Sequence, residues 1–86
     1  MTVFLVDEPY SAIAFAYAAA DSAAKVVLLQ DGVYLAKRGA FRGDVYYIKD
    51  DAVSRGLGEA FPKGAHAIDF GDLVSMLEQE KVVNFL

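Results

Sequence analysis

Short apolar runs alternate along the chain with segments of helical periodicity. Runs rich in β-branched and aromatic residues predict five buried strands, at 2–6, 25–29, 44–48, 65–68 and 82–85. Helix-start and helix-stop residues between them predict helices at 10–23, 33–38, 51–55 and 72–79. This alternation is typical of βαβ units. It predicts a single α/β domain over residues 1–86, a three-layer α/β/α sandwich with a mostly parallel sheet of about five strands.

Particular residues mark the ends of these elements. Gly39 and Gly56 each follow a predicted helix, where a left-handed glycine often ends the helix, so we predict a positive φ at Gly56. After the second strand comes Gln30-Asp31-Gly32. We interpret this segment as punctuation between a strand and a helix, in which Asp31 caps the helix and Gly32 permits a tight turn.

The first predicted helix carries aromatic residues on two sides. Tyr10, Ile13 and Tyr17 share one stripe on a helical wheel, and Phe15 points nearly the opposite way. We predict that the stripe covers the sheet and that Phe15 faces a partner. Apolar residues make up 56% of the 86 residues, which is more than so small a domain is expected to hide alone. The composition therefore predicts an oligomer.

The charge limits the function classes. A net charge of −4 argues against nucleic-acid binding as the main activity, because phosphate recognition needs a basic face. The only basic concentration, Lys37, Arg38 and Arg42, is typical of a solvated turn. The start of the sequence lacks the basic region of a signal peptide, and the weakly polar stretch 13–20 is too short to span a bilayer. We expect a cytoplasmic protein without membrane or direct nucleic-acid partners.

Acidic residues follow the predicted strands. Asp7, Asp31, Asp50 and Asp69 each come after one strand, so a parallel sheet gathers them at its carboxyl edge. Helix capping explains them all, at about 0.5–2 kcal/mol per cap. The alternative is a magnesium site of Asp7, Glu8 and Asp50, similar to the site of receiver domains. Receivers also need a hydroxyl residue after the fourth strand and a lysine after the fifth, which are missing here. Capping is favoured, and no metal or cofactor is predicted.

Other catalytic motifs are missing or weak. No GxGxxG follows the first strand, and there is no P-loop. His66, the sole histidine, lies within a predicted strand, which is more typical of a structural role. No serine has the context of a nucleophile elbow. The sequence therefore predicts no catalytic residue.

Three patterns in order suggest a family. They are VVLLQDGV, VYYIKDDAVSRGL and HAIDFGDLVSML, and together they resemble the TusB/DsrH family within the DsrE/DsrF-like superfamily. The resemblance covers about residues 25–77 and the first strand, and its specificity lies in the combination. It implies a small α/β sandwich that assembles with DsrE-like and DsrF-like proteins. Such complexes pass persulfide sulfur towards the 2-thio group of the tRNA wobble uridine, or serve sulfur oxidation.

The chain departs from this family pattern in one respect. In the DsrE-like member a reactive cysteine lies shortly before an Arg-Gly pair similar to Arg55-Gly56, yet residues 49–51 hold no thiol and the sequence contains no cysteine. Because sulfur relay needs a thiolate, the resemblance implies a non-catalytic subunit. The alternative is a self-assembling module of the same fold that binds a small ligand or regulates. The expected partner-contact or rim residues are Phe15, Asp31, Asp50, Arg55 and Asp69.

Overall fold

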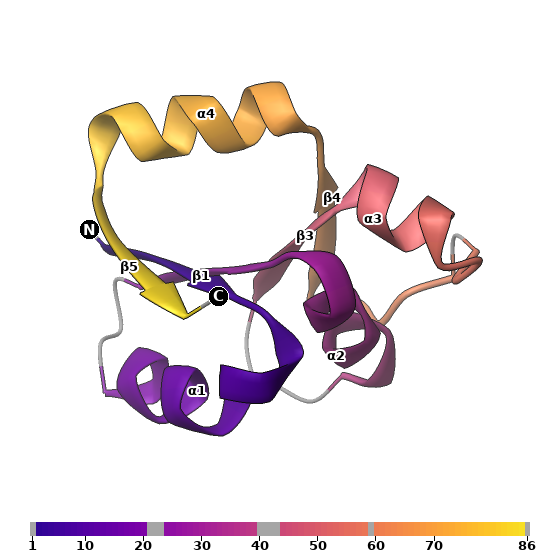
Figure 1. Ribbon diagram of the computed structural model, residues 1–86, viewed down its shortest axis with the longest axis horizontal. Helices are drawn as coiled ribbons and strands as arrows, with labels where there is room; N and C mark the ends of the chain where they lie inside the picture. Colours follow the sequence, from indigo (N-terminus) through magenta and orange to yellow (C-terminus); the bar gives the residue numbers. More distant parts are fainter. Residues whose placement is uncertain (1, 21–23, 40–43, 59, 86) are drawn as a thin grey trace.

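A parallel sheet lies between two layers of helices (Figure 1). The computed structural model describes residues 2–20, 24–39, 44–58 and 60–85. The strands are β1 (Thr2–Val6), β2 (Lys25–Leu28), β3 (Val45–Ile48), β4 (Ala65–Ile68) and β5 (Lys81–Phe85). The helices are α1 (Ser11–Ala19), α2 (Val33–Arg38), α3 (Lys49–Ser54) and α4 (Phe70–Gln79), with the short 3-10 segments η1 (Glu8–Tyr10) and η2 (Gln30–Gly32) before α1 and α2. The predicted strands and the α/β sandwich are confirmed.

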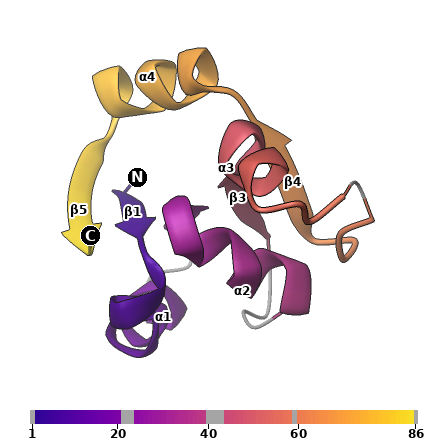
Figure 2. The ribbon, with the colours of Figure 1, turned by 45° about the vertical axis from the view of Figure 1, so that its right-hand side comes forward.

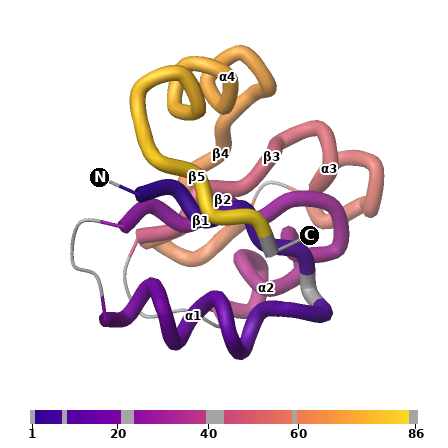
Figure 3. Tube along the Cα trace, turned by 60° about the vertical axis from the view of Figure 1, so that its left-hand side comes forward, coloured from indigo at the N-terminus to yellow at the C-terminus, as the bar shows by residue number. Residues whose placement is uncertain are grey.

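The strand order places the helices on two faces. The order is β4-β3-β2-β1-β5, and every neighbouring pair is parallel. From β1 to β4 the chain moves one strand at a time in one direction, so right-handed crossovers put α1, α2 and α3 on one face. Helix α4 carries the chain back across the sheet to β5, and it lies on the other face (Figures 1 and 2). Figure 3 shows β5 beside β1.

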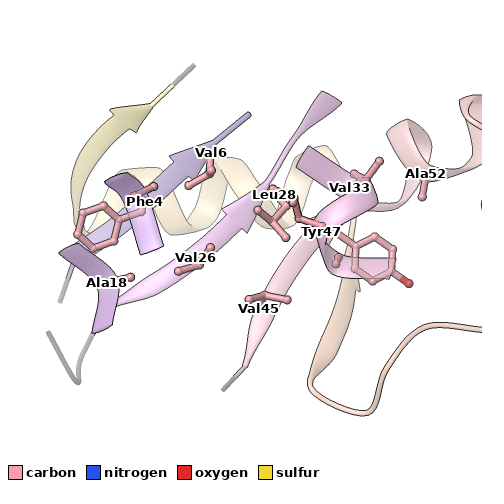
Figure 4. Close-up of a cluster of buried hydrophobic side chains, with 12 residues drawn as sticks. Phe4, Val6, Ala18, Val26, Leu28, Val33, Val45, Tyr47 and Ala52 are labelled. Carbon is pink, nitrogen blue, oxygen red and sulfur yellow. The ribbon is translucent and has the colours of Figure 1, made fainter. Parts of the chain in front are cut away.

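The strands bury apolar residues on both faces, as the central strands of a parallel sheet do. On the side of α1 and α2, Phe4, Val6 and Leu28 belong to one buried cluster (Figure 4). On the side of α4, Val3 and Val27 belong to a second cluster. Consecutive strand residues therefore contribute alternately to the two cores, which fixes the register of each strand.

The orientation predicted for α1 is wrong. Ala14 and Ala18 are buried against the sheet and Phe15 packs at the margin of that core, whereas Ile13 is 56% and Tyr17 61% exposed. The reason is the closeness of helix and sheet. The small alanine face lets the helix lie near the strands, whose own large side chains fill the layer between them. Ile13 and Tyr17 are thus left on the outer side of the helix.

The predictions for the turn glycines have different outcomes. Gly39 and Gly56 have φ of 65° and 66°, which confirms the prediction for Gly56. Gly32 has an ordinary φ of −59°, so its conformation does not require glycine. A Cβ there would lie 2.5 Å from the carbonyl oxygen of Val6, so close approach of the backbone to β1 excludes a side chain.

Of the helix caps that the sequence predicts after β2, β3 and β4, the structure shows one, at Asp69. Neither Asp31 before α2 nor Asp50 before α3 makes a side-chain cap hydrogen bond, so capping is the wrong interpretation of these two residues. Asp50 instead lies inside the first turn of α3. Across the described ranges, no helix is both long and apolar enough to cross a membrane.

Candidate functional site at the carboxyl edge

The turn after β2 is held by a carboxylate from α3. Gln30 has a φ of 51°, which a residue with a side chain rarely adopts and which costs free energy. Its backbone N–H donates a 2.8 Å hydrogen bond to Oδ2 of Asp51. The strained turn and the first turn of α3 are therefore fastened to each other at the carboxyl ends of β2 and β3.

Arg55 completes this connection. Its Nε donates to Oδ1 of Asp31 at 3.0 Å, and its Nη1 donates to the backbone carbonyl of Asp51 at 3.2 Å. The hydrogen bond to Asp31 is the main cause that raises the pKa of the Arg55 guanidinium, so this side chain is always charged. We call Gln30, Asp31, Asp51 and Arg55 the rim network.

The rim network is suited to holding a shape rather than to proton or group transfer. Its cation is already paired, and such partly exposed ion pairs contribute little to stability. Asp31 remains 60% exposed and faces solvent beside the turn. The arrangement presents a fixed backbone turn with a charged border, which is a surface for contact.

The carboxyl end of β3 lies next to this network. The connection after β3 leads to α3 on one face, whereas the connection after β4 leads to α4 on the other, so the chain diverges at the carboxyl ends of these two strands. Lys49 lies there, in the stretch where the family resemblance implies a thiol. A cavity of about 260 Å³ adjoins it, lined by Tyr47, Lys49, Ala52, Val53, Gly58 and Ala67.

Asp69 has the capping role that the sequence predicts. Its Oδ1 accepts from the backbone N–H of Asp72 at 2.7 Å, and Oδ2 of Asp72 accepts from the backbone N–H of Asp69 at 3.2 Å. This reciprocal capping box starts α4 and occupies the carboxylate. In the part of the chain that the structure describes, no group of three or more metal-ligating side chains could hold an ion.

The remaining predicted residues lie elsewhere. Phe15 is on α1 against the core. The Lys37 ammonium donates to the carbonyl oxygen of Ala60 and lies 4.9 Å from the centroid of the Phe61 ring, so it fastens a loop. Arg42 falls outside the described residues. The rim network thus joins Asp31 with Arg55 but does not include Phe15 or Asp69.

Sequence reasoning missed Gln30 and Asp51 as members of the network. The spacing of Asp51 and Arg55, four residues apart at a helix, is a usable signal for their contact. The pairing of Arg55 with Asp31 spans 24 residues and depends on strand order, so no local pattern reveals it. The left-handed backbone of Gln30 has no sequence signal, because glycine is the usual residue there.

The outer side of α1 forms a second candidate surface. Ala12, Ile13, Ala16, Tyr17 and Ala20 line a shallow apolar groove, which we call the α1 surface. No charged residue occurs between Ser11 and Ala20. A contiguous exposed apolar patch of this kind is typical of a protein–protein contact.

Comparisons with known proteins agree with this architecture. The DsrH family model, described as "DsrH like protein", matches residues 9–83. Protein Tm0979 from Thermotoga maritima, solved by NMR, is similar with a TM-score of 0.69 and 30% identity, covering 93% of this chain and 94% of that one. The ychN protein from E. coli is similar with a TM-score of 0.76, covering 98% and 97%, and at 17% identity it shows the fold alone. A search of curated proteins gives no match.

Proposed function

Since the chain belongs to the DsrH-like family, we propose that it is a non-catalytic subunit of a sulfur-relay complex. At family level it is a sulfur-relay-type protein. The observation that carries the proposal is a family match over residues 9–83 in a sequence without cysteine. Relay proteins carry sulfur as a persulfide on a thiolate, so this chain supports transfer by a cysteine-bearing partner.

The proposed role at the carboxyl edge is to complete a partner's site. Residues 49 and 50 directly precede Asp51 of the rim network, and the hydrogen bond of Arg55 to Asp31 gives that edge a fixed shape. A DsrE-like partner docked there keeps its persulfide cysteine in one orientation and away from bulk water. The relayed sulfur then goes to the 2-thio group of the tRNA wobble uridine or enters sulfur oxidation.

The α1 surface is the proposed assembly contact, with DsrE-like and DsrF-like proteins or with further copies of the chain. Support comes from the exposure of Ile13 and Tyr17 and from the absence of charge along the helix. Burial of such side chains stabilises a contact by about 25 cal/mol per Å² of apolar surface. An uncharged helix also meets a copy of itself without electrostatic repulsion.

A sulfur-labelling experiment tests the role. The chain is incubated with a cysteine desulfurase and sulfur-labelled cysteine, with and without a DsrE-like protein from the same cell. We expect reducible label on the partner alone and faster transfer from the partner when this chain is present. Binding without any change in the transfer rate would mean that family membership describes fold and ancestry only.

Matched substitutions test the contact. Ile13→Asp places a charge on the α1 surface, and Val74→Asp makes the same change on α4, where Val74 is 52% exposed. A buried unpaired charge costs several kcal/mol, so we expect Ile13→Asp to weaken association by about a hundredfold or more. Val74→Asp should leave association unchanged. Light scattering and co-purification measure both.

The outcome also separates the alternative function. If the chain self-associates but binds no DsrE-like protein, the self-assembling ligand-binding or regulatory module takes the place of the relay subunit. If the wild type is monomeric at micromolar concentration and co-purifies with no partner, both functions are wrong. If Ile13→Asp and Val74→Asp weaken association equally, then the contact is not specific to α1.

A further inference from the structure

Another cavity lies beneath the end of α2, on the face of the sheet that α1 and α2 cover. It has a volume of about 600 Å³ and is formed where α2 ends and where β3 and β4 begin. None of the four residues of the rim network lines this cavity. A volume of this size is within the range of about 300–1,000 Å³ that is typical of small-molecule sites.

The inner wall of the cavity is apolar and is held in place by the packing of the core. Leu28, Leu35 and Val45 line it and are each no more than 5% exposed, so they are fixed by packing on their other sides. Ala36 and Ala65 also line it, and their small side chains leave the space open. The wall therefore offers dispersion contacts and no hydrogen-bonding side chain.

The charged side chains lie at the solvent end of the cavity. Asp44, Lys63 and His66 line it and are all exposed. The Asp44 carboxylate is already engaged, because its Oδ1 lies 3.2 Å from Nε2 of His66. Among the described residues, no acidic side chain forms an ion pair with Lys63. The ammonium of Lys63 is thus the charge at this mouth that is left to bind a ligand.

We propose that this cavity binds a small monocarboxylate with an apolar body. The body packs against Leu28, Leu35 and Val45, and the carboxylate lies at the mouth near Lys63. His66 contributes by holding the Asp44 carboxylate in place at the mouth. The site is separate from the proposed sulfur-relay role, and either can fail without the other.

Three probes with six carbon atoms each test the ligand class by NMR titration of the isotope-labelled protein: hexanoate, 1-hexanol and hexylamine. For a probe of this size we expect a dissociation constant of about 1–10 mM. Shifts should concentrate at the backbone amides of Val45, Gly64 and Ala65. Hexanoate should bind about two- to fivefold more tightly than 1-hexanol, because an exposed ion pair contributes little more. Hexylamine should bind most weakly.

Variants with opposite signs sharpen the test. Lys63→Gln should weaken hexanoate about two- to fivefold and leave 1-hexanol unchanged, whereas Asp44→Asn should tighten hexanoate about twofold. Lys81→Gln removes an exposed lysine at the start of β5 on the far edge of the sheet and should change nothing. Ala65→Leu fills the cavity and should weaken all three probes about tenfold or more.

The proposal is overturned by several results. Shifts away from the cavity, or no saturation by about 50 mM hexanoate, would show that no such site exists. If hexylamine binds most tightly, then Asp44 is the side chain that selects the ligand, and the ligand is a cation. Loss of hexanoate selectivity in Lys81→Gln but not in Lys63→Gln would also refute it. Because Lys63 and Asp44 are exposed, their variants keep the test valid even if Ala65→Leu unfolds.

Discussion

Helices α1 and α4 lie on opposite faces of the sheet and are stabilised in different ways. Helix α4 begins with the capping box of Asp69 and Asp72, and it packs Leu73, Met76 and Leu77 against the core. Helix α1 begins at Tyr10 without a side-chain cap, and it packs through Ala14 and Ala18. Its two bulkiest exposed side chains, Ile13 and Tyr17, face outward.

The difference shows which parts of the molecule are explained by a single chain. The capping box and Leu73 stabilise α4 itself and the core beneath it, and α4 also leaves Phe70 and Val74 about half exposed. The apolar outer side of α1 stabilises neither its own helix nor the core, and it exposes surface that water disfavours. Because α1 carries no charge whereas α4 carries Asp72 and Glu78, we propose that the assembly contact lies on α1 rather than on α4.

The largest expected effect is on core packing, to which α4 and α1 should contribute differently at these positions. Leu73→Ala removes a buried side chain beneath α4 and should lower the free energy of unfolding by about 2–4 kcal/mol at any protein concentration. Ile13→Ala on α1 should cost less than about 0.5 kcal/mol in the monomer. Urea unfolding at about 1 and 100 μM protein distinguishes the two, because loss of a subunit contact depends on concentration.

A contradicting result would be informative in either direction. If Ile13→Ala costs several kcal/mol at both concentrations, then Ile13 is buried within the monomer and the α1 surface is not an interface. If Ile13→Ala lowers stability only at high protein concentration, then Ile13 stabilises an assembly, whereas Leu73 stabilises the folded monomer.

A middle-sized effect concerns the helix starts. Asp69→Ala removes the cap of α4 and should cost about 1 kcal/mol, whereas Asp69→Asn keeps an acceptor and should cost only a few tenths. Thermal unfolding measures both. Tyr10→Ala at the start of α1 removes no cap and should not show the same loss. An Asp69→Ala variant as stable as the wild type would mean that the box does not stabilise α4.

The smallest effect concerns helix propensity on the exposed sides. Ser75→Ala on α4 should stabilise by about 0.5 kcal/mol, because alanine is the better helix former. Ala12→Ser on α1 should destabilise by a similar amount in the monomer. A clearly larger loss for Ala12→Ser at high protein concentration would show that close packing of a partner against α1 adds to the propensity term.

Much of the fold is predictable from local patterns. The strands follow from short β-branched runs, and the parallel order follows from their alternation with helices. The ends of α2 and of the turn after α3 follow from Gly39 and Gly56, whose backbone conformation favours glycine. Asp69 is predictable as a cap because the acidic residue three positions later completes a known motif.

The rest depends on distances in space. Asp31 looks like a cap in the sequence, but Arg55, brought to it by the neighbouring strand, takes its carboxylate. Gly32 looks like a turn glycine, but the carbonyl of Val6 is what excludes a side chain. The predicted orientation of α1 is wrong for the same reason. How closely the helix approaches the sheet depends on which side chains the strands already bury.

The pairing of β5 with β1 bears on how the chain folds during synthesis. Strands β1 to β4 join the sheet in the order in which the ribosome delivers them, each beside the strand before it. Strand β5 alone must reach back past β3, β2 and β1 to the outer edge of β1, in the register that joins Thr2 to Lys81 and Val6 to Phe85. Until then the outer edge of β1 has unpaired backbone groups, which can template pairing with another chain. The nascent protein is therefore most exposed to edge-to-edge aggregation until α4 has crossed the sheet.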